Sequence, residues 1–423
     1  MALKKKPITG MRDVMPGEME IREYCTSVIQ KTYASYGFQS IETPCVENIE
    51  NLTSKSGGDN EKLIFKILKR GEKLRLDEAK SEADLVDGGL RYDLTVPLVR
   101  YYAAHENELP MPFKALQMGN VWRADRPQKG RYRQFMQCDI DIIGEPTYLA
   151  EIELILAASS ALGQLGFKNF QIRINDRRIL KAIARYSGFP DERFDEICIV
   201  LDKMDKIGLD GVEQELQDEG FAEDAVQKYV SLYQGLVEQT KEDHALSFLE
   251  EKLDGYIEKD ILPNLREIIQ TVETAKEAEF QMVFDPTIVR GMSYYTGTIF
   301  EIALPQLGIS AGGGGRYDEM VGRFTGKNVP ACGVSIGFER IILVLLQEGF
   351  TIPGKREKKA YLLDRNISSE DLKKAMKRAQ EERAEGKDVL VVHMNRNRGF
   401  QKKQLSEQGY TLFEEIHHDE MKE

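Results

Sequence analysis

The chain of 423 residues is poor in histidine, the side chain that most often serves as a general base in enzymes. Only five histidines are present, and none of them lies near the dense motifs described below. A Ser-His-Asp or Cys-His mechanism is therefore not expected, because no base would stand beside a nucleophile. The five are His105, His244, His393, His417 and His418.

Cysteine is equally scarce, and its placement excludes two further classes. The five cysteines are odd in number, scattered along the chain and never arranged as CxxC. This pattern argues against a disulfide framework and against a zinc site, and no other protein-only metal motif is evident. It fits a reducing compartment, so we expect a cytoplasmic location. The five are Cys25, Cys45, Cys138, Cys198 and Cys332.

Long apolar runs are also missing. No run approaches the roughly 20 residues that span a bilayer, so no membrane association is expected. The opening "MALKKKPITGMRD" is basic but has no apolar core, and no secretory signal is predicted. The net charge of -12 argues against nonspecific coating of nucleic acid. It leaves room for a local basic groove.

The length exceeds one ordinary core and predicts two or three domains. Strand and helix patterns alternate up to residue 175, a charged helical stretch follows, and strand patterns then return. We predict an α+β catalytic domain formed by 1–175 and 278–350. An inserted helical domain would occupy 176–277. A small α/β domain with strand, helix, strand, helix and strand would occupy 355–423.

A cationic loop followed by an acidic strand is the most unusual local feature. In "VWRADRPQKGRYRQFMQCDIDIIG", five basic side chains surround a proline and a glycine, and the next strand carries Gln137, Asp139 and Asp141 at alternate positions. Such alternation is typical of any sheet with one solvated face. A short, acceptor-rich face beside five cations also fits a ligand with an amine or imidazole N–H and a phosphate. The five cations are Arg123, Arg126, Lys129, Arg131 and Arg133.

Two glycine-containing motifs follow later in the chain. "GVSIGFERI" places Arg340 in the first turn of an apolar helix, where it could join the helix N-terminus in binding phosphate. The alternative is a surface arginine paired with Glu339 or Asp318. "GGGGRYD" at 312–318 indicates close backbone approach to a ligand, or simply a tight turn. It lacks the spacing of a P-loop or a Rossmann fingerprint.

The order of these motifs resembles the histidyl-tRNA synthetases, a class II aminoacyl-tRNA synthetase family. The resemblance covers roughly 7–350, beginning with "GMRDVMP". The region of Pro44 resembles class II motif 1, the cationic hairpin motif 2 and "GFERI" motif 3. "RGMSYYTG" and "GGGGRYD" are similar to two segments particular to the histidine enzymes. The fold implied is an antiparallel six-stranded sheet flanked by helices.

The resemblance implies ATP and Mg²⁺ as cofactors and assigns the catalytic roles to arginines. Arg123 would hold the α-phosphate of ATP, and Arg340 would clamp the γ-phosphate end. Arg290 would contact both the α-phosphate and the substrate carboxylate. Arg131 belongs to the ATP side by the same resemblance. The loop would meet the acceptor end of a tRNA through Arg126, Gln128 and Lys129.

The same resemblance implies a histidine pocket. The amino group would be received by Asp93, Thr95 and Gln137. The imidazole would be read by Asp141 and Tyr295. The pocket would be completed by Tyr294, Gly313 and Gly315. Asp139 receives no role, and neither does Ser293, which departs from the residue common at its position.

The function implied is histidine–tRNA ligation. Histidine and ATP would form histidyl-adenylate, from which histidine passes to the 3′ end of its tRNA, and motif 1 implies a homodimer. The C-terminal domain, however, is shorter than in the family. A shortened tail also fits relatives that serve as noncatalytic regulatory subunits of ATP phosphoribosyltransferase, and a free-standing RNA- or nucleotide-binding paralogue is a third alternative. Retention of Arg123, Arg290 and Arg340 favours the enzyme.

Overall fold

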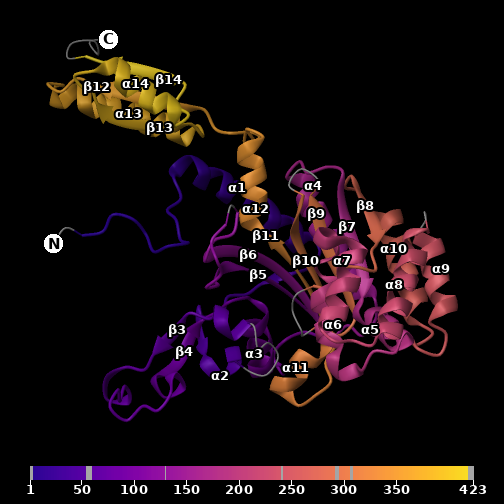
Figure 1. The fold of residues 1–423 in the computed structure, drawn as a ribbon. Helices are drawn as coiled ribbons and strands as arrows, with labels where there is room; N and C mark the ends of the chain where they lie inside the picture. The colour runs from indigo at the N-terminus through magenta and orange to yellow at the C-terminus, as the bar shows by residue number, and fades with distance from the viewer. Residues whose placement is uncertain are drawn as a thin grey trace. The chain divides into compact units, whose positions relative to one another are not determined.

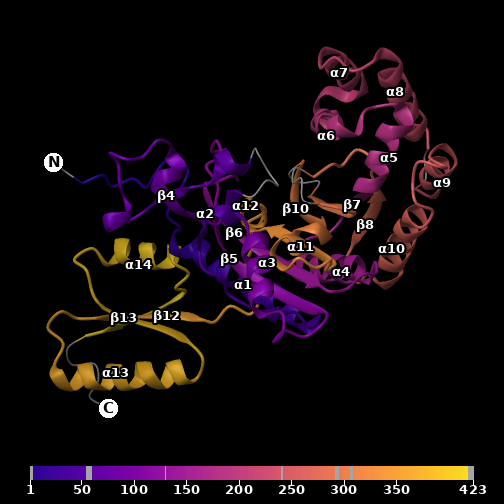
Figure 2. The same ribbon diagram turned by 90° about the horizontal axis from the view of Figure 1, so that it is seen from below.

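The computed structural model divides into two compact units. The larger unit comprises Met1–Asp13 and Cys25–Gln347, and the smaller unit comprises Val14–Tyr24 and Glu348–Glu423. Figures 1 and 2 show the ribbon from two directions, coloured by residue number. The residues described are 3–53, 60–128, 130–239, 242–290, 295–304 and 308–417.

An eight-stranded sheet forms the centre of the larger unit, in the order β1-β5-β6-β11-β10-β9-β7-β8. The six inner strands, from β5 to β7 in this order, are antiparallel to their neighbours. The predicted six-stranded antiparallel sheet is thus confirmed. The outer strands β1 and β8 are additions, each parallel to its neighbour. The strands are β1 (Gln39–Ser40), β5 (Phe113–Trp122), β6 (Gln134–Ile143), β7 (Phe170–Asp176), β8 (Phe280–Phe284), β9 (Thr298–Leu304), β10 (Ile309–Arg316) and β11 (Ala331–Gly337).

Helices pack around this sheet, and most of those that follow β7 form a cluster beyond its β7–β8 edge (Figures 1 and 2). Local sequence sets their ends. The Asp176 side chain accepts from the Arg178 N–H at the start of α5, and Gly188 ends that helix with φ of 96°. The helices are α1 (Pro16–Ser35), α3 (Thr95–His105), α4 (Leu149–Gln164), α5 (Arg177–Ser187), α6 (Phe194–Leu201), α7 (Met204–Asp218), α8 (Glu223–Val237), α9 (Glu242–Lys252), α10 (Ile261–Ala275), α11 (Asp318–Thr325) and α12 (Phe338–Gln347).

A buried ion pair fastens α4 to the sheet. Arg316 at the end of β10 donates from Nε and Nη2 to the two carboxylate oxygens of Glu151, over 2.7 and 2.6 Å. Both side chains are buried. A second, small sheet joins the strands β2 (Val46–Asn48), β4 (Val86–Leu90) and β3 (Lys66–Leu68), with α2 (Ile49–Thr53) beside it. Among the described residues, no helix has the length and apolar character required to cross a membrane.

The smaller unit has the predicted order of strand, helix, strand, helix and strand. Its three parallel strands lie in the order β13-β12-β14. Tyr361 and Leu363 of the central strand pack into one core cluster, and Ala360 and Leu362 into another, because both faces of a parallel sheet are covered. The elements are β12 (Lys358–Leu363), α13 (Ser369–Ala384), β13 (Asp388–His393), α14 (Arg398–Glu407) and β14 (Leu412–Ile416).

Candidate active site

The inner strands bring a small acidic pocket together on one face of the large sheet. Its volume is about 110 Å³. Three carboxyl groups line it, all buried: Asp93, at the turn before α3, and Asp139 and Asp141, both on β6. Six residues that the sequence assigned to histidine binding meet here, namely Asp93, Thr95, Gln137, Asp141, Tyr295 and Gly313.

Burial raises the pKa of all three carboxyl groups. It raises the pKa of Asp93 to about 6. Burial also raises the pKa of Asp141 to about 7, against a hydrogen bond from Tyr317, and the charge of Asp93 contributes further. The pKa of Asp139 is raised well above its usual value by burial and then by Asp141. Such a pocket favours a cationic or N–H-bearing ligand, which would restore the charged forms.

Two acceptors in the pocket have no protein partner among the described residues. Oδ1 of Asp93 accepts from the Val96 N–H, over 3.1 Å, while its buried Oδ2 accepts nothing. Gln137 donates from Nε2 to the hydroxyl of Ser335, over 2.9 Å, while its buried Oε1 accepts nothing. Buried acceptors without donors are costly, so their presence marks the place of a ligand donor.

Asp141 is oriented by a tyrosine to which the sequence assigned no role. The Tyr317 hydroxyl donates to Oδ1 of Asp141 over 2.5 Å. Tyr317 is the tyrosine of "GGGGRYD", so the motif carried a signal for it. Gly333 on the neighbouring β11 leaves room for this carboxylate, because a Cβ there would stand 1.9 Å from Oδ1 of Asp141. Tyr295 also lines the pocket.

The other residues that were considered for the histidine pocket do not all line it. Gly315 does not line the pocket; its φ is 159°, and a Cβ there would stand 3.0 Å from Cδ1 of Tyr295. Asp139, which received no role, does line it and accepts from Nε2 of Gln137 over 3.3 Å. Tyr294, Ser293 and Lys129 lie outside the described residues.

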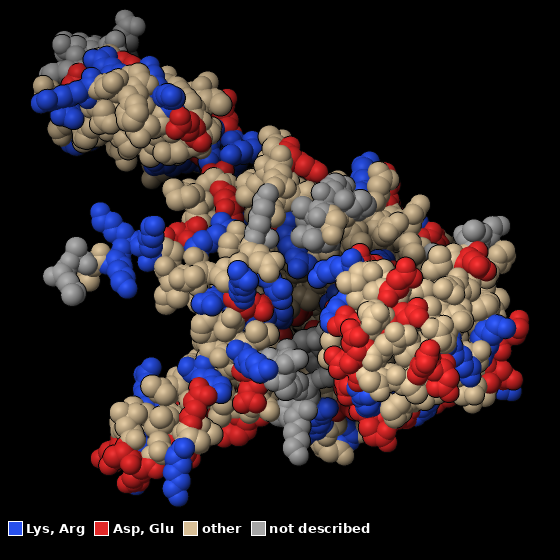
Figure 3. All heavy atoms as spheres, viewed as in Figure 1, with Lys and Arg blue, Asp and Glu red and all other residues tan. Residues whose placement is uncertain are grey.

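A larger cavity of about 530 Å³ adjoins the acidic pocket. The two share lining residues, among them Gln137 and Ser335. In Figure 3, blue Lys and Arg side chains border the hollow near the centre of the view. The cavity is lined by all four arginines to which the sequence assigned ATP contacts, namely Arg123, Arg131, Arg290 and Arg340.

Neighbouring groups hold the first two arginines of this cavity. Arg123 donates from Nε to the Tyr92 carbonyl over 2.8 Å, and its guanidinium lies 5.1 Å from the centre of the Phe135 ring. Arg131 donates from Nε to Asp125 over 3.1 Å. These contacts restrict the positions that the two guanidinium groups can take.

Arg340 lies at the start of α12, as predicted, and donates from Nη1 to the Ser310 carbonyl. Burial lowers its pKa, and nearby Arg131 lowers it further. The two acids considered as its surface partners pair with other cations, Glu339 with Arg12 over 3.3 Å and Asp318 with Arg316 over 3.4 Å. Four arginines against three acids line the cavity, and these arginines are the groups that a polyphosphate would engage.

The described residues among the proposed tRNA contacts, Arg126 and Gln128, lie at the tip of the hairpin formed by β5 and β6. Arg126 and Gln128 are exposed to solvent. The Gln128 N–H donates to the Arg131 carbonyl over 3.1 Å, and the Arg131 N–H donates back over 2.9 Å, closing a tight turn. The described part of the tip therefore presents Arg126 and Gln128 to solvent.

An antiparallel six-stranded sheet with a cationic hairpin, and with an arginine in the first turn of the helix that follows β11, is the arrangement of the class II aminoacyl-tRNA synthetases. The family model described as histidyl-tRNA synthetase matches residues 10–341. The chain belongs to the histidyl-tRNA synthetase family, as the sequence motifs predicted.

Curated relatives agree with this assignment. A histidine–tRNA ligase of Leifsonia xyli subsp. xyli is 47% identical over 360 residues, covering 81% of this chain and 80% of the relative. One from Christiangramia forsetii is 37% identical over 407 residues, covering 90% and 86%.

Solved structures share the fold. The crystal structure of histidyl-tRNA synthetase from Nostoc sp. PCC 7120 matches with a TM-score of 0.80 and 28% identity, covering 99% of this chain and 93% of that one. A Bacillus halodurans structure titled as an ATP phosphoribosyltransferase regulatory subunit/histidyl-tRNA synthetase matches with a TM-score of 0.76, covering 99% of both chains. At 21% identity the second match shows the fold alone.

Proposed function

We propose that this chain is an ATP-dependent histidine–tRNA ligase that uses the two adjoining cavities for its two small substrates. The observation that carries the proposal is the junction of an acidic pocket with unpartnered acceptors and a larger cavity lined by four arginines. Histidine would occupy the first and ATP the second. Their shared wall is where the amino acid carboxylate and the α-phosphate would meet.

The chemistry of activation suits these residues. The carboxylate oxygen of histidine forms a bond to the α-phosphorus, the bond from that phosphorus to the bridging oxygen breaks, and pyrophosphate leaves. The nucleophile is already ionised, so positioning and charge stabilisation matter more than a base. Arg123 and Arg290 line the shared wall and would stabilise the α-phosphate, while Arg340 would hold the γ-phosphate end.

Recognition of histidine follows from the acceptors of the pocket. Asp93 Oδ2 and Gln137 Oε1 would receive the amino group, with Thr95 beside them. Asp141, oriented by Tyr317, would accept from an imidazole N–H. An amino acid without that donor would leave a buried carboxyl unpaired, which disfavours its binding.

Mg²⁺ would accompany ATP. The carboxylate of Glu339 lines the large cavity, and a hard oxygen donor of this kind suits the ion. Bound there, Mg²⁺ would neutralise part of the charge of the polyphosphate.

The remaining assignments concern the whole chain. The catalytic domain would comprise 1–175 and 278–350, with 176–277 inserted and 355–423 as a shortened C-terminal domain. Arg126, Gln128 and Lys129 would contact the acceptor end of the tRNA, and the region of Pro44 would form a homodimer interface. Cytoplasmic location follows from the substrates proposed.

A regulatory subunit of ATP phosphoribosyltransferase is the alternative that the short tail favours. Such a subunit needs a histidine pocket but no set of arginines for ATP. The four arginines lining one cavity favour the ligase. So do the relatives named ligases at 37 to 47% identity, against 21% for the match whose title includes the regulatory subunit.

The test is histidine-dependent exchange between ATP and pyrophosphate by the purified chain, followed by charging of its tRNA. Exchange together with charging is expected. Absence of exchange would contradict the activation step, and exchange without charging would locate a defect in tRNA use.

A substitution at Arg290 tests its assigned role. Arg290→Ala should lower the exchange turnover at least about 100-fold, because the developing charge loses its cation. Its histidine affinity should weaken by less than about tenfold, since the pocket acceptors remain. Arg75→Ala, at an exposed arginine, is the matched control. Turnover near that of the unmodified chain would refute the role of Arg290.

A further inference from the structure

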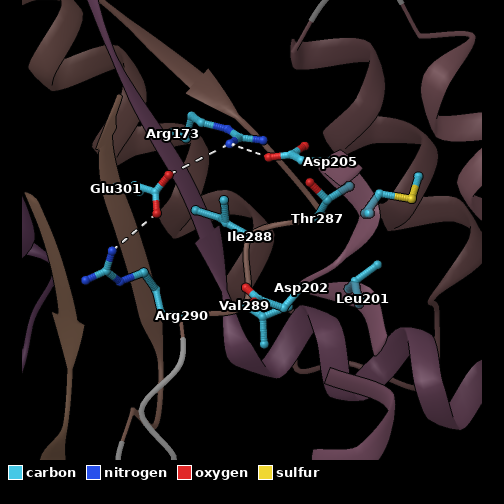
Figure 4. Close-up of a pocket in the computed structure, with 10 residues that line it drawn as sticks. Arg173, Leu201, Asp202, Asp205, Thr287, Ile288, Val289, Arg290 and Glu301 are labelled. Carbon is cyan, nitrogen blue, oxygen red and sulfur yellow. Dashed lines mark hydrogen bonds and ion pairs between the residues drawn. The ribbon is translucent and has the colours of Figure 1, made fainter. Parts of the chain in front are cut away.

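A third cavity lies beside the two already described. Its volume is about 120 Å³, and it lies between the sheet and the helices α6 and α7. It shares Arg290 and Glu301 with the large cavity. Figure 4 shows its lining residues, with Arg173, Glu301 and Arg290 on one side and Asp205 facing Arg173.

A chain of ion pairs crosses this cavity and ends at Arg290. Nη1 of Arg290 lies 3.3 Å from Oε2 of Glu301. The other oxygen of Glu301 lies 3.8 Å from Nη1 of Arg173, and the same Nη1 lies 3.2 Å from Oδ2 of Asp205 (Figure 4). Asp205 belongs to α7, whereas Arg173 and Glu301 belong to the sheet. The series thus joins a helix of the inserted segment to a proposed catalytic arginine.

Strand register brings together Arg173 and Glu301, the middle residues of this series of ion pairs. Arg173 on β7 lies opposite Glu301 on β9, and Glu301 lies opposite Gly313 on β10. Side chains directly opposite each other in an antiparallel pair are neighbours on one face. Gly313 leaves that face open for Arg290, because a Cβ there would stand 2.7 Å from its Nη1. The guanidinium of Arg290 therefore lies over Gly313 and beside Glu301.

The backbone that leads to Arg290 is hydrogen-bonded both by the sheet and by helix α8 of the inserted segment. Arg290 has a φ of 57°, in a region that non-glycine residues seldom occupy. The Asn175 side chain on β7 donates to the Ile288 carbonyl over 3.2 Å. The Tyr233 hydroxyl on α8 donates to the Pro286 carbonyl over 3.1 Å. An unusual conformation persists only where its surroundings hold it, and here both sheet and inserted helices do so.

We propose that Glu301 is a positioning residue for Arg290, and that Arg173 links this carboxylate to Asp205 of α7. The inference rests on the proposed ligase function. A guanidinium has five N–H donors. Through this ion pair Glu301 would fix the orientation in which the guanidinium meets the α-phosphate and the histidine carboxylate. Arg173 also pairs with Asp285, so a displacement of α7 that withdrew Asp205 would leave the charge of Arg173 to Asp285 and Glu301 and so alter the orientation of Arg290.

The principal test substitutes Glu301 and measures exchange kinetics. Glu301→Gln keeps the shape but removes the charge, and it should lower the exchange kcat about tenfold while the histidine KM changes less than about threefold. A lower kcat with a nearly unchanged histidine KM is expected when a positioning residue is lost, and it is not expected from general loss of structure. A kcat within about twofold of the unmodified chain would overturn the positioning role.

A double-mutant cycle tests the link to α7. Asp205→Asn should lower kcat about threefold in the unmodified chain and have no effect in the Glu301→Gln background, because coupled residues are non-additive. Additive effects would overturn the link. Asp202→Asn, which lines the same cavity but forms none of the ion pairs described, is the matched control and should leave kcat unchanged.

Two measurements distinguish a failure of the positioning role from a failure of the ligase proposal and from loss of folding. Exchange by the unmodified chain comes first, since its absence would refute the ligase proposal rather than the positioning role. Thermal melting of each variant detects loss of folding. Should Glu301→Gln fail to fold, Arg173→Lys replaces it, because lysine keeps the charge but cannot engage Asp285, Asp205 and Glu301 together through one planar group. That variant should show the same loss of kcat, and an unchanged kcat would overturn the inference.

Discussion

Gly333 shows how one absent side chain shapes the proposed histidine pocket. The carboxylate of Asp141 occupies the space that a Cβ at position 333 would take. Asp141 also depends on Tyr317, whose hydroxyl fixes one of its oxygens. In the proposed pocket, histidine recognition would therefore rest on Gly333 of β11 and on Tyr317, which follows β10, as well as on the acids themselves.

Gly333→Ala should weaken histidine binding. The added methyl group displaces Asp141 and leaves the imidazole N–H without its acceptor, so the Kd should rise at least about tenfold. Isothermal titration calorimetry measures it. Gly17→Ala is the control, because a Cβ at Gly17 in α1 meets no atom within 4 Å, and its Kd should be unchanged. An unchanged Kd for Gly333→Ala would contradict this account of the pocket.

The raised pKa of Asp93 predicts a pH dependence of stability. Its pKa is about 6 in the folded chain against an ordinary 3.8. Unfolding therefore releases a proton between these pH values, and the contribution of Asp93 to the free energy of unfolding falls as pH rises through this window. Asp93→Asn lacks this titration. Relative to the unmodified chain, the variant should gain at most about 3 kcal/mol between pH 4 and pH 7.

Urea unfolding across that pH range, without histidine, measures the difference between the two proteins. A constant difference would show that Asp93 titrates alike in the folded and unfolded chain. Asp87→Asn, at an exposed acid on β4, is the control and should keep the pH profile of the unmodified chain.

At the scale of elements, the pair of Arg316 and Glu151 joins β10 to α4. Both side chains are buried, so removing one partner leaves an uncompensated charge. Glu151→Ala should lower the free energy of unfolding by about 3–5 kcal/mol. Chemical denaturation provides the measurement.

Glu153 on the same helix supplies the comparison. It pairs with Lys114 over 2.6 Å, and 33% of its side chain is exposed. Glu153→Ala should therefore lower the free energy of unfolding by about 1 kcal/mol or less. Equal losses for the two variants would mean that burial of the Arg316 pair does not set its contribution.

For the whole molecule, the resemblance of the Pro44 region to class II motif 1 predicts a homodimer. Val46, two residues further on, is 48% exposed in the single chain, as an interface residue would be. Sedimentation at about 1 µM, well above the Kd of a stable nanomolar dimer, should give twice the chain mass of 48.2 kDa. Val46→Asp should shift the chain toward monomer by placing a charge in the interface. A monomeric unmodified chain would contradict the prediction.

The sequence determined the family, the six-stranded sheet and most of the side chains now found around the two proposed substrate cavities. These came from the resemblance of the ordered motifs to the histidyl-tRNA synthetases, while strand alternation showed which side chains share a face, as in the series of Gln137, Asp139 and Asp141. The parallel pairing of the two edge strands with this sheet was not predicted. Their pairing depends on contacts between segments far apart in the chain, such as Gln39 with Ala115.

Only the tertiary structure decided which polar groups meet. Asp139 stood without a role in the sequence, and the fold places it in the acidic pocket beside Gln137. The ion pairs from Asp205 to Arg290 likewise join four segments that no local pattern connects. Register across several strands and the packing of a distant helix create such neighbours, and these arise from long-range contacts that a linear motif does not encode.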